Sequence, residues 1–217
     1  LNDEQMVWRR SKIVELKDDT LFKQEYPATA AEAFQVSGLD PYIKPEIVMV
    51  ARKVTDIEDI GFKTIGVDPA RFGDDRSVIV IRQMEKIIHK ETYSGQDTMQ
   101  ITGHILRLAK DQLVKAENIN IDVIGIGAGI VDRCKEQGWN VNAVSVSEKA
   151  DDYEHYLNLR AELYADKVKE WIKSADLPDD DDYYELANIK YKFNSKGQMQ
   201  LESKDDMKKR GLPSPDV

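Results

Sequence analysis

Thr64-Ile65-Gly66-Val67-Asp68 is a short apolar run that ends in a carboxylate. A second run, Ile119-Asn120-Ile121-Asp122-Val123-Ile124-Gly125-Ile126, is apolar on both faces, as expected of a strand in the centre of a sheet. Isoleucine and valine dominate both runs, and β-branched residues favour strands. We therefore predict two core strands, the first ending at Asp68 and the other carrying Asp122 within it.

The segments around these two runs predict the rest of a sheet. Residues 77–81 and 87–92 are β-rich and separated by short turns, so with 64–68 they form an antiparallel meander. Apolar residues then recur at spacings of three and four, which indicates an amphipathic helix: Ile101, Ile105, Leu108, Ala109 and Leu113. A helix over about 130–137 and a strand over 141–146 follow the second run.

The predicted order β-β-β-α-β-α-β gives an α/β fold. Its central sheet is mixed, with a three-stranded antiparallel meander plus parallel strands, and helices flank it. Downstream, the pattern predicts a long helix from about Tyr156 to Ile172 and a hairpin of residues 191–193 and 199–201.

Domain organisation is expected to change near residue 60. Residues 1–60 carry scattered aromatic residues and are interrupted by Pro27, Pro41 and Pro45, which predicts a connector or arm. Residues 61–217 form the predicted domain. The chain begins without Met and stops at Ser214-Pro215-Asp216-Val217, which resembles a helix start, so we expect a truncated C-terminal helix.

Composition limits the possible functions. One cysteine excludes a disulfide framework and fits a reducing compartment. No apolar run is long enough for a membrane span and no signal peptide is visible, which predicts a cytosolic protein. The net charge of −9 argues against nucleic-acid binding, yet the charge is uneven. An acidic run, Asp179–Asp182, precedes a basic cluster of Lys204, Lys208, Lys209 and Arg210.

Asp68 and Asp122 are the informative residues. A buried carboxylate needs a partner, and neither run contains Lys or Arg. A hard divalent cation is a suitable partner because Mg²⁺ and Mn²⁺ prefer oxygen ligands. The alternative is that Asp68-Pro69 starts a turn and that Asp122 lies on a solvated face.

The remaining motifs are weaker. The chain has no P-loop, and Ile130 stands where the dinucleotide fingerprint of Gly125–Gly129 would need a glycine. Cys134 is expected to be inert core packing. We expect the acidic run to be a solvated loop, with loosely bound cations as the alternative.

Several short motifs occur in the order found in one family. They are Trp8-Arg9-Arg10, Glu25-Tyr26-Pro27-Ala28-Thr29, Gly66-Val67-Asp68-Pro69-Ala70, Asp122 with Gly125-Ile126-Gly127, Asn158-Leu159-Arg160-Ala161-Glu162, Glu202-Ser203-Lys204-Asp205-Asp206 and Ser214-Pro215-Asp216. With these motifs in this order, the chain resembles the C-terminal half of the large terminase subunit of tailed bacteriophages.

The resemblance implies a nuclease domain of ribonuclease-H-like fold that cuts concatemeric double-stranded viral DNA when packaging starts and ends. Asp68, Asp122 and Asp216 would be its catalytic, metal-binding acids, holding two divalent cations, Mg²⁺ or Mn²⁺. In the family a further Asp follows the segment that matches Asp216, beyond the end of this chain. The basic cluster would contact the DNA backbone.

The implied partners are an N-terminal ATPase domain, the portal protein and the small terminase subunit, in the host cytoplasm and without a membrane. Two other readings stay open. An ATP-binding domain of the actin and sugar-kinase type would need a second copy of the fold, and a non-catalytic docking module would not need the two acids to face one site.

Overall fold

The computed structural model describes residues 3–16, 22, 26, 41–55, 57–58, 60–70 and 76–212. The chain divides into two compact units, Leu1–Asp40 and Pro41–Val217. These compact units divide at 40/41, and the domain boundary near residue 60 stays a prediction. Asp216 and the expected start of a C-terminal helix lie outside the described residues.

Residues 41–55 belong to the second unit because they pack into it. Helix α4 (Pro45–Ala51) has its proline in the first turn, where a missing N–H is tolerated, and it buries Val48. Tyr42 N donates to Ile189 O at 3.0 Å, and Leu177 N donates to Ala51 O at 3.0 Å. Pro45 thus starts a helix of the domain instead of interrupting a connector.

In the first unit, helix α1 (Asp3–Leu16) carries an aromatic cluster. The Trp8 ring meets Tyr26 edge-on at a centroid distance of 5.0 Å and Phe22 at 6.0 Å. The Arg9 guanidinium lies over the Phe22 ring at 4.9 Å. These contacts keep Phe22 buried.

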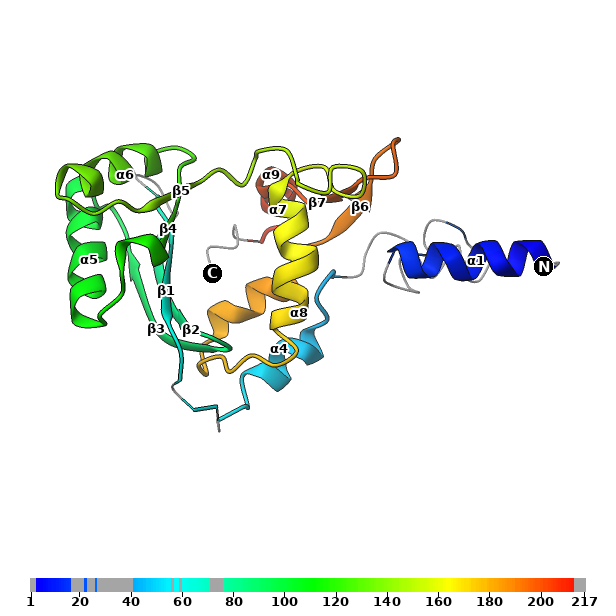
Figure 1. Cartoon of the computed structure of the whole chain (residues 1–217), viewed down its shortest axis with the longest axis horizontal. Coiled ribbons are helices and arrows are strands. Elements are labelled where there is room, and N and C mark those ends of the chain that lie inside the picture. Colours follow the sequence, from blue (N-terminus) through cyan, green and yellow to red (C-terminus); the bar gives the residue numbers. More distant parts are fainter. Residues whose placement is uncertain are drawn as a thin grey trace. The chain divides into compact units, whose positions relative to one another are not determined.

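The second unit is built on a five-stranded mixed sheet (Figure 1). Its strands are β1 (Lys63–Asp68), β2 (Ser77–Gln83), β3 (Lys86–Tyr93), β4 (Ile119–Asp122) and β5 (Asn142–Val144), in the order β3-β2-β1-β4-β5. β1, β2 and β3 pair antiparallel, and β4 and β5 continue the sheet in parallel from β1. The predicted meander plus parallel strands is confirmed.

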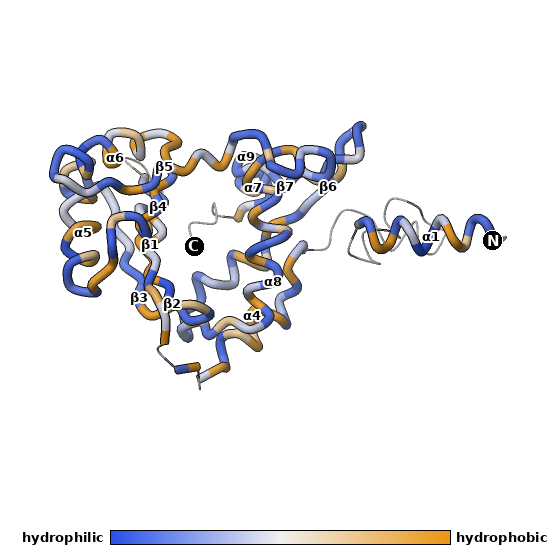
Figure 2. Tube along the Cα trace, in the orientation of Figure 1, coloured by the Kyte–Doolittle hydropathy of each residue, from blue (hydrophilic) through white to orange (hydrophobic). Residues whose placement is uncertain are grey.

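One face of the sheet carries the main core. Helices α5 (Thr98–Asp111) and α6 (Gly127–Glu136) cover this face, and Figure 2 shows apolar and polar residues alternating around α5. Buried residues of the strands and both helices form one apolar cluster, including Ile65, Ile79, Ile105, Ile121, Ile130 and Cys134. A capping box of Asp97 and Gln100 starts α5.

Leu113 departs from the predicted apolar stripe. Helix α5 ends at Asp111, and Leu113 follows with φ +57° and 89% of its surface exposed. Val114 N closes the helix end on Ala109 O at 2.8 Å. Leu113 thus occupies the left-handed position that usually follows a helix, which turns it out of the core.

The other face of the sheet is flanked by the later elements (Figure 1). The predicted long helix is confirmed as α7 (Leu159–Glu162) and α8 (Lys169–Trp171), joined by a π-helical stretch η2 (Leu163–Val168). The predicted hairpin is β6 (Tyr191–Phe193) with β7 (Met199–Leu201), preceded by the 3₁₀ helix η3 (Asp181–Ala187). A further 3₁₀ turn, η1 (Ala116–Asn118), leads into β4, and α9 (Lys204–Lys209) follows the hairpin.

No helix in the described part of the chain combines the length and the apolar character that crossing a membrane requires.

Candidate active site

Asp68 and Asp122 lie side by side at the end of the sheet where β1 and β4 finish. We call this end of the sheet, with its two carboxylates, the acid edge. They are the last residues of β1 and β4, which are parallel neighbours in the register Val67↔Ile121. Neighbouring strands are about 4.8 Å apart, and residues in register point to the same face. Val67 and Ile121 are buried in the main core, so the two carboxylates point to the opposite face, where both are partly exposed.

The position of Asp122 corrects one expectation. The sequence predicted a strand through Ile126 with Asp122 inside it, but β4 ends at Asp122. Asp122 Oδ1 instead accepts a hydrogen bond from Ile124 N at 2.9 Å, and Gly125 turns the chain with φ +69°. The Asp122 carboxylate therefore begins a turn at the end of its strand.

Gly127 makes this turn possible. A Cβ at this position would lie 1.7 Å from Asp122 O and 3.2 Å from Pro69 Cγ. The helix α6 can start against the Asp122 carbonyl only because residue 127 has no side chain. Gly127 thus serves close packing beside Asp122, a role different from that of a glycine in a phosphate-binding loop.

Ser77 supports Asp68 in a similar way. It is fully buried, and its hydroxyl accepts from Ala70 N at 2.9 Å and donates to Ala70 O at 2.8 Å. Ala70, two residues after Asp68, is therefore bonded to the start of β2. A single serine gives no signal in the sequence, so this support was not predicted.

Lys204 is the one member of the predicted basic cluster that the described structure brings to the acids. Its Nζ lies 3.7 Å from Asp68 Oδ2, and both side chains are partly exposed. It opens helix α9, which Ser203 caps by accepting from Asp206 N at 3.1 Å. The cap therefore fixes the first turn of α9, and with it the backbone position from which the Lys204 side chain extends.

The other three basic residues differ from one another. Lys208 is exposed, and Lys209 donates to Asp206 Oδ1 at 2.9 Å. Arg210 donates twice to Glu202, at 2.8 and 2.6 Å, and once to Asn188 O at 2.9 Å. The Arg210 guanidinium is thus engaged within the fold, while the two lysines face solvent.

Arg160 also lies at this edge; it belongs to one of the motifs that carry the family resemblance, but no role was predicted for it. It stands in the first turn of α7, where Asn158 caps the helix by accepting from Ala161 N at 3.0 Å. Its Nη1 donates to Glu202 O at 2.9 Å. The pKa of Arg160 is lowered overall, because the effect of burial outweighs the charges of Tyr164, Asp68 and Glu202, which act in the opposite direction.

The donor set at the acid edge fits a hard divalent cation. Two neighbouring carboxylates supply oxygen ligands, and Mg²⁺ is commonly held by one or two carboxylates with water and substrate phosphate. No group of three or more His, Cys, Asp or Glu residues that could hold a metal occurs within the described ranges. Among the described residues, the Asp68 and Asp122 pair is therefore what the protein offers as ligands to a cation.

The acidic run is solvated at Asp179 and Asp181, as predicted, but its carboxylates also form ion pairs. Asp179 and Asp181 contact Arg52, Asp180 and Asp182 contact Lys90, and Asp182 also contacts Arg76 at 3.3 Å. Burial lowers the pKa of Lys90, but hydrogen bonds and charges of Asp180 and Asp182 outweigh it and raise the pKa overall. The partners Arg52, Arg76 and Lys90 come from three distant segments. These ion pairs could therefore not be predicted from the sequence alone.

Cys134 is fully buried, as predicted. Burial raises the pKa of its thiol to about 11, which keeps it protonated and unreactive at neutral pH.

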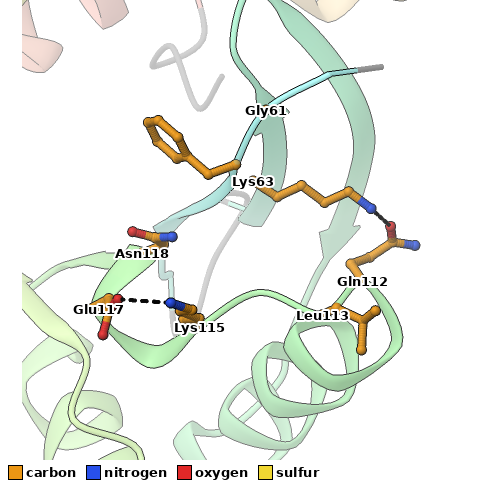
Figure 3. A pocket seen from close by; sticks show the side chains of 8 residues that line it. Gly61, Lys63, Gln112, Leu113, Lys115, Glu117 and Asn118 are labelled. Atoms are coloured by element: carbon orange, nitrogen blue, oxygen red, sulfur yellow. Dashed lines mark hydrogen bonds and ion pairs between the residues drawn. The ribbon is translucent and has the colours of Figure 1, made fainter.

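A separate pocket lies at the opposite end of β1 (Figure 3). It is lined by Gly61, Phe62, Lys63, Gln112, Leu113, Lys115, Glu117 and Asn118. Lys63 Nζ donates to Gln112 Oε1 at 3.1 Å and Lys115 pairs with Glu117 at 3.7 Å, so its charged groups are already engaged with one another. It contains neither Asp68 nor Asp122.

Comparison with solved structures identifies the fold. No family model and no curated protein matches the sequence. A mutant nuclease domain of the large terminase subunit gp2 of bacterial virus Sf6, solved with manganese and β-thujaplicinol, matches with a TM-score of 0.67 and 21% identity, covering 81% of this chain and 94% of that one.

A second match is the large terminase nuclease of thermophilic phage G20c with bound magnesium, with a TM-score of 0.53 and 18% identity, covering 69% of this chain and 76% of that one. These similarities and the strand order confirm the predicted ribonuclease-H-like fold. In fold, the chain thus resembles terminase nuclease domains, as the sequence motifs indicated.

Proposed function

We propose that this chain is the metal-dependent endonuclease domain of a phage DNA-packaging terminase. Its substrate would be the phosphodiester bonds of concatemeric double-stranded viral DNA, cut when packaging starts and ends in the host cytoplasm. The observation that supports this most directly is the juxtaposition of Asp68 and Asp122 at the ends of two parallel neighbours, β1 and β4. This pair occurs in a fold shared with terminase nucleases.

Asp68 and Asp122 would hold two divalent cations, Mg²⁺ or Mn²⁺, with Asp216 as the proposed third acid. Such ions supply Lewis-acid activation of a phosphate and of an attacking water. The chain's own part is to fix the two carboxylates, through the Ala70–Ser77 hydrogen bonds on one side and the turn at Gly127 on the other. Preorganisation of this kind lowers the cost of assembling charge at the scissile phosphate.

Lys204, Lys208 and Lys209 are the proposed contacts to the DNA backbone. All three are exposed and belong to the helix that starts beside Asp68. We propose a smaller part for Arg210, because Glu202 and Asn188 already engage it. An ATPase domain, a portal protein and a small terminase subunit would be the partners of the complete motor.

The actin-type alternative is less well supported, because the described residues contain a single five-stranded sheet and a two-stranded hairpin. A second copy of the fold, which that architecture needs, is not found among them. A docking module would have no use for the two adjacent carboxylates.

The proposal is tested by incubating the chain with supercoiled plasmid in Mg²⁺, Mn²⁺ or EDTA, with ATP binding measured in parallel. We expect nicked and linear products with either metal, none with EDTA, and no ATP binding. ATP binding without cleavage would favour the actin-type alternative, and neither activity would favour the docking module.

A further inference from the structure

A backbone hydrogen bond of Arg160 places its helix, α7, near the acid edge. Arg160 N donates to Val146 O at 2.8 Å, two residues beyond the end of β5. β5 is paired in register with β4, with Val144 opposite Asp122. The first turn of α7 is therefore held at the same end of the sheet as the two carboxylates.

The side chain of Arg160 connects this helix to the segment that carries Lys204. Its Nη1 donates to Glu202 O, and the Glu202 carboxylate accepts two hydrogen bonds from Arg210. Glu202 N donates to Lys190 O at 2.8 Å. Glu202 is thus bonded through its carbonyl, its amide and its carboxylate.

Lys204 follows this fixed residue after one position. Ser203 caps α9, and the Lys204 ammonium then lies 3.7 Å from Asp68 Oδ2. Arg160 is thus hydrogen-bonded to Glu202, the backbone leads from Glu202 through Ser203 to Lys204, and Lys204 pairs with Asp68. The charges of Asp68 and Glu202 both act on the Arg160 guanidinium, in agreement with this arrangement.

We propose that Arg160 is a positioning residue that fixes Glu202 and so holds the Lys204 ammonium at Asp68. The inference rests on the proposed function only for its consequence at the metal. At the metal site, a lysine held beside Asp68 competes with a divalent cation for the same carboxylate. Removing the lysine, or releasing it from this position, therefore tightens metal binding.

The positioning step is tested first without metal, by hydrogen exchange of the intact chain. Arg160→Ala is expected to speed exchange of the bonded amides of Met207, Arg210 and Gly211 by about tenfold, while β1 and β4 keep their protection. Arg160→Lys, which keeps the charge and guards against misfolding, is expected to restore part of that protection. Arg133→Ala removes an arginine from α6 and serves as the matched control. Unchanged exchange in α9 for Arg160→Ala would overturn the proposal.

The link to Lys204 is tested by a double-mutant cycle on the Mn²⁺ dissociation constant, measured by calorimetry. We expect Lys204→Ala and Arg160→Ala each to tighten binding about threefold to tenfold. In the Lys204→Ala protein, Arg160→Ala should change the constant by less than about twofold, because the lysine it positions is gone. An undiminished effect of Arg160→Ala in that background would contradict the proposal.

The two experiments separate this inference from the proposed function. A parent chain that binds no Mn²⁺ contradicts the proposed function, while hydrogen exchange still decides whether Arg160 fixes α9. A parent chain that binds Mn²⁺ and cuts DNA, combined with an additive cycle, contradicts only the role of Arg160.

Discussion

Gly127 shapes the acid edge most directly, because it has no side chain where α6 packs against Asp122. A methyl group there would overlap Asp122 O, so Gly127→Ala must displace the end of β4 or the start of α6. We expect a loss of about 1–3 kcal/mol in the free energy of unfolding, measured in urea, and weaker Mn²⁺ binding.

Gly129 in the same helix provides the control for Gly127. A Cβ at Gly129 would meet only Thr98 Cγ2, at 3.9 Å. Gly129→Ala should therefore raise stability by about 0.5–1 kcal/mol through helix propensity alone. Equal stabilities of the two variants would refute the packing role assigned to Gly127.

Cys134 gives a second test at this scale. With its thiol pKa raised to about 11 from 9.0, the thiolate fraction at pH 8 falls about 100-fold, and burial blocks access further. Native protein should react with an aromatic disulfide reagent at least about 100-fold more slowly than protein unfolded in urea. Fast labelling of the native chain would contradict the buried placement of α6.

At the scale of elements, Leu113 shows how a helix end can be improved. Its left-handed backbone costs a non-glycine residue about 1–2 kcal/mol, and its exposed side chain contributes little burial in return. Leu113→Gly should therefore raise the free energy of unfolding by about 1 kcal/mol. Leu157→Gly, at another exposed leucine but without a positive φ, should lower it.

The acidic run makes η3 and its neighbours sensitive to low pH. Burial raises the pKa of Asp180, but hydrogen bonds from Lys90 and Asp182 N, with the charges of Lys90 and Arg52, lower it overall. A carboxyl whose folded pKa is depressed stabilises the protein above its unfolded pKa, near 3.8, and loses this contribution as pH falls through the folded value.

Asp180→Asn retains the cap on Asp182 N and removes only the charge. The variant should lose about 1 kcal/mol or less at pH 7, relative to the parent, and the difference should shrink below pH 4. Urea unfolding at pH 7 and pH 3.5 measures this, with Asp151→Asn as an exposed control. A difference that is the same at both pH values would show that the ion pair is not its origin.

At the scale of the whole molecule, the sequence patterns predicted the sheet better than its surroundings. Runs of β-branched residues gave β1, β2 and β3 because strand propensity and turn signals are local. The adjacency of Asp68 and Asp122 followed from placing both acids on core strands. The roles of Ser77 and Arg160 were not predicted, because they depend on bonds to Ala70 and Glu202, which lie close only after folding.

The packing of α4 into the second unit was not predicted for the same reason. Pro45 has a local meaning as a helix breaker and another as the first residue of a helix, and only the packing of α4 against later segments distinguishes them. The acidic run was similarly interpreted without Arg52, Arg76 and Lys90, its partners from other segments.

The central claim is that Asp68 and Asp122 together form a metal-dependent nuclease site. It is tested most directly by the rate of supercoiled plasmid nicking in Mn²⁺ for the parent chain, Asp68→Asn, Asp122→Asn and Asp132→Asn. Asn removes the charge with little change in shape, and Asp132 is an exposed acid of α6 outside the pair. We predict that the parent and Asp132→Asn nick at similar rates, while each of the other two loses at least about 100-fold. Cleavage that survives in Asp68→Asn and Asp122→Asn would contradict the account.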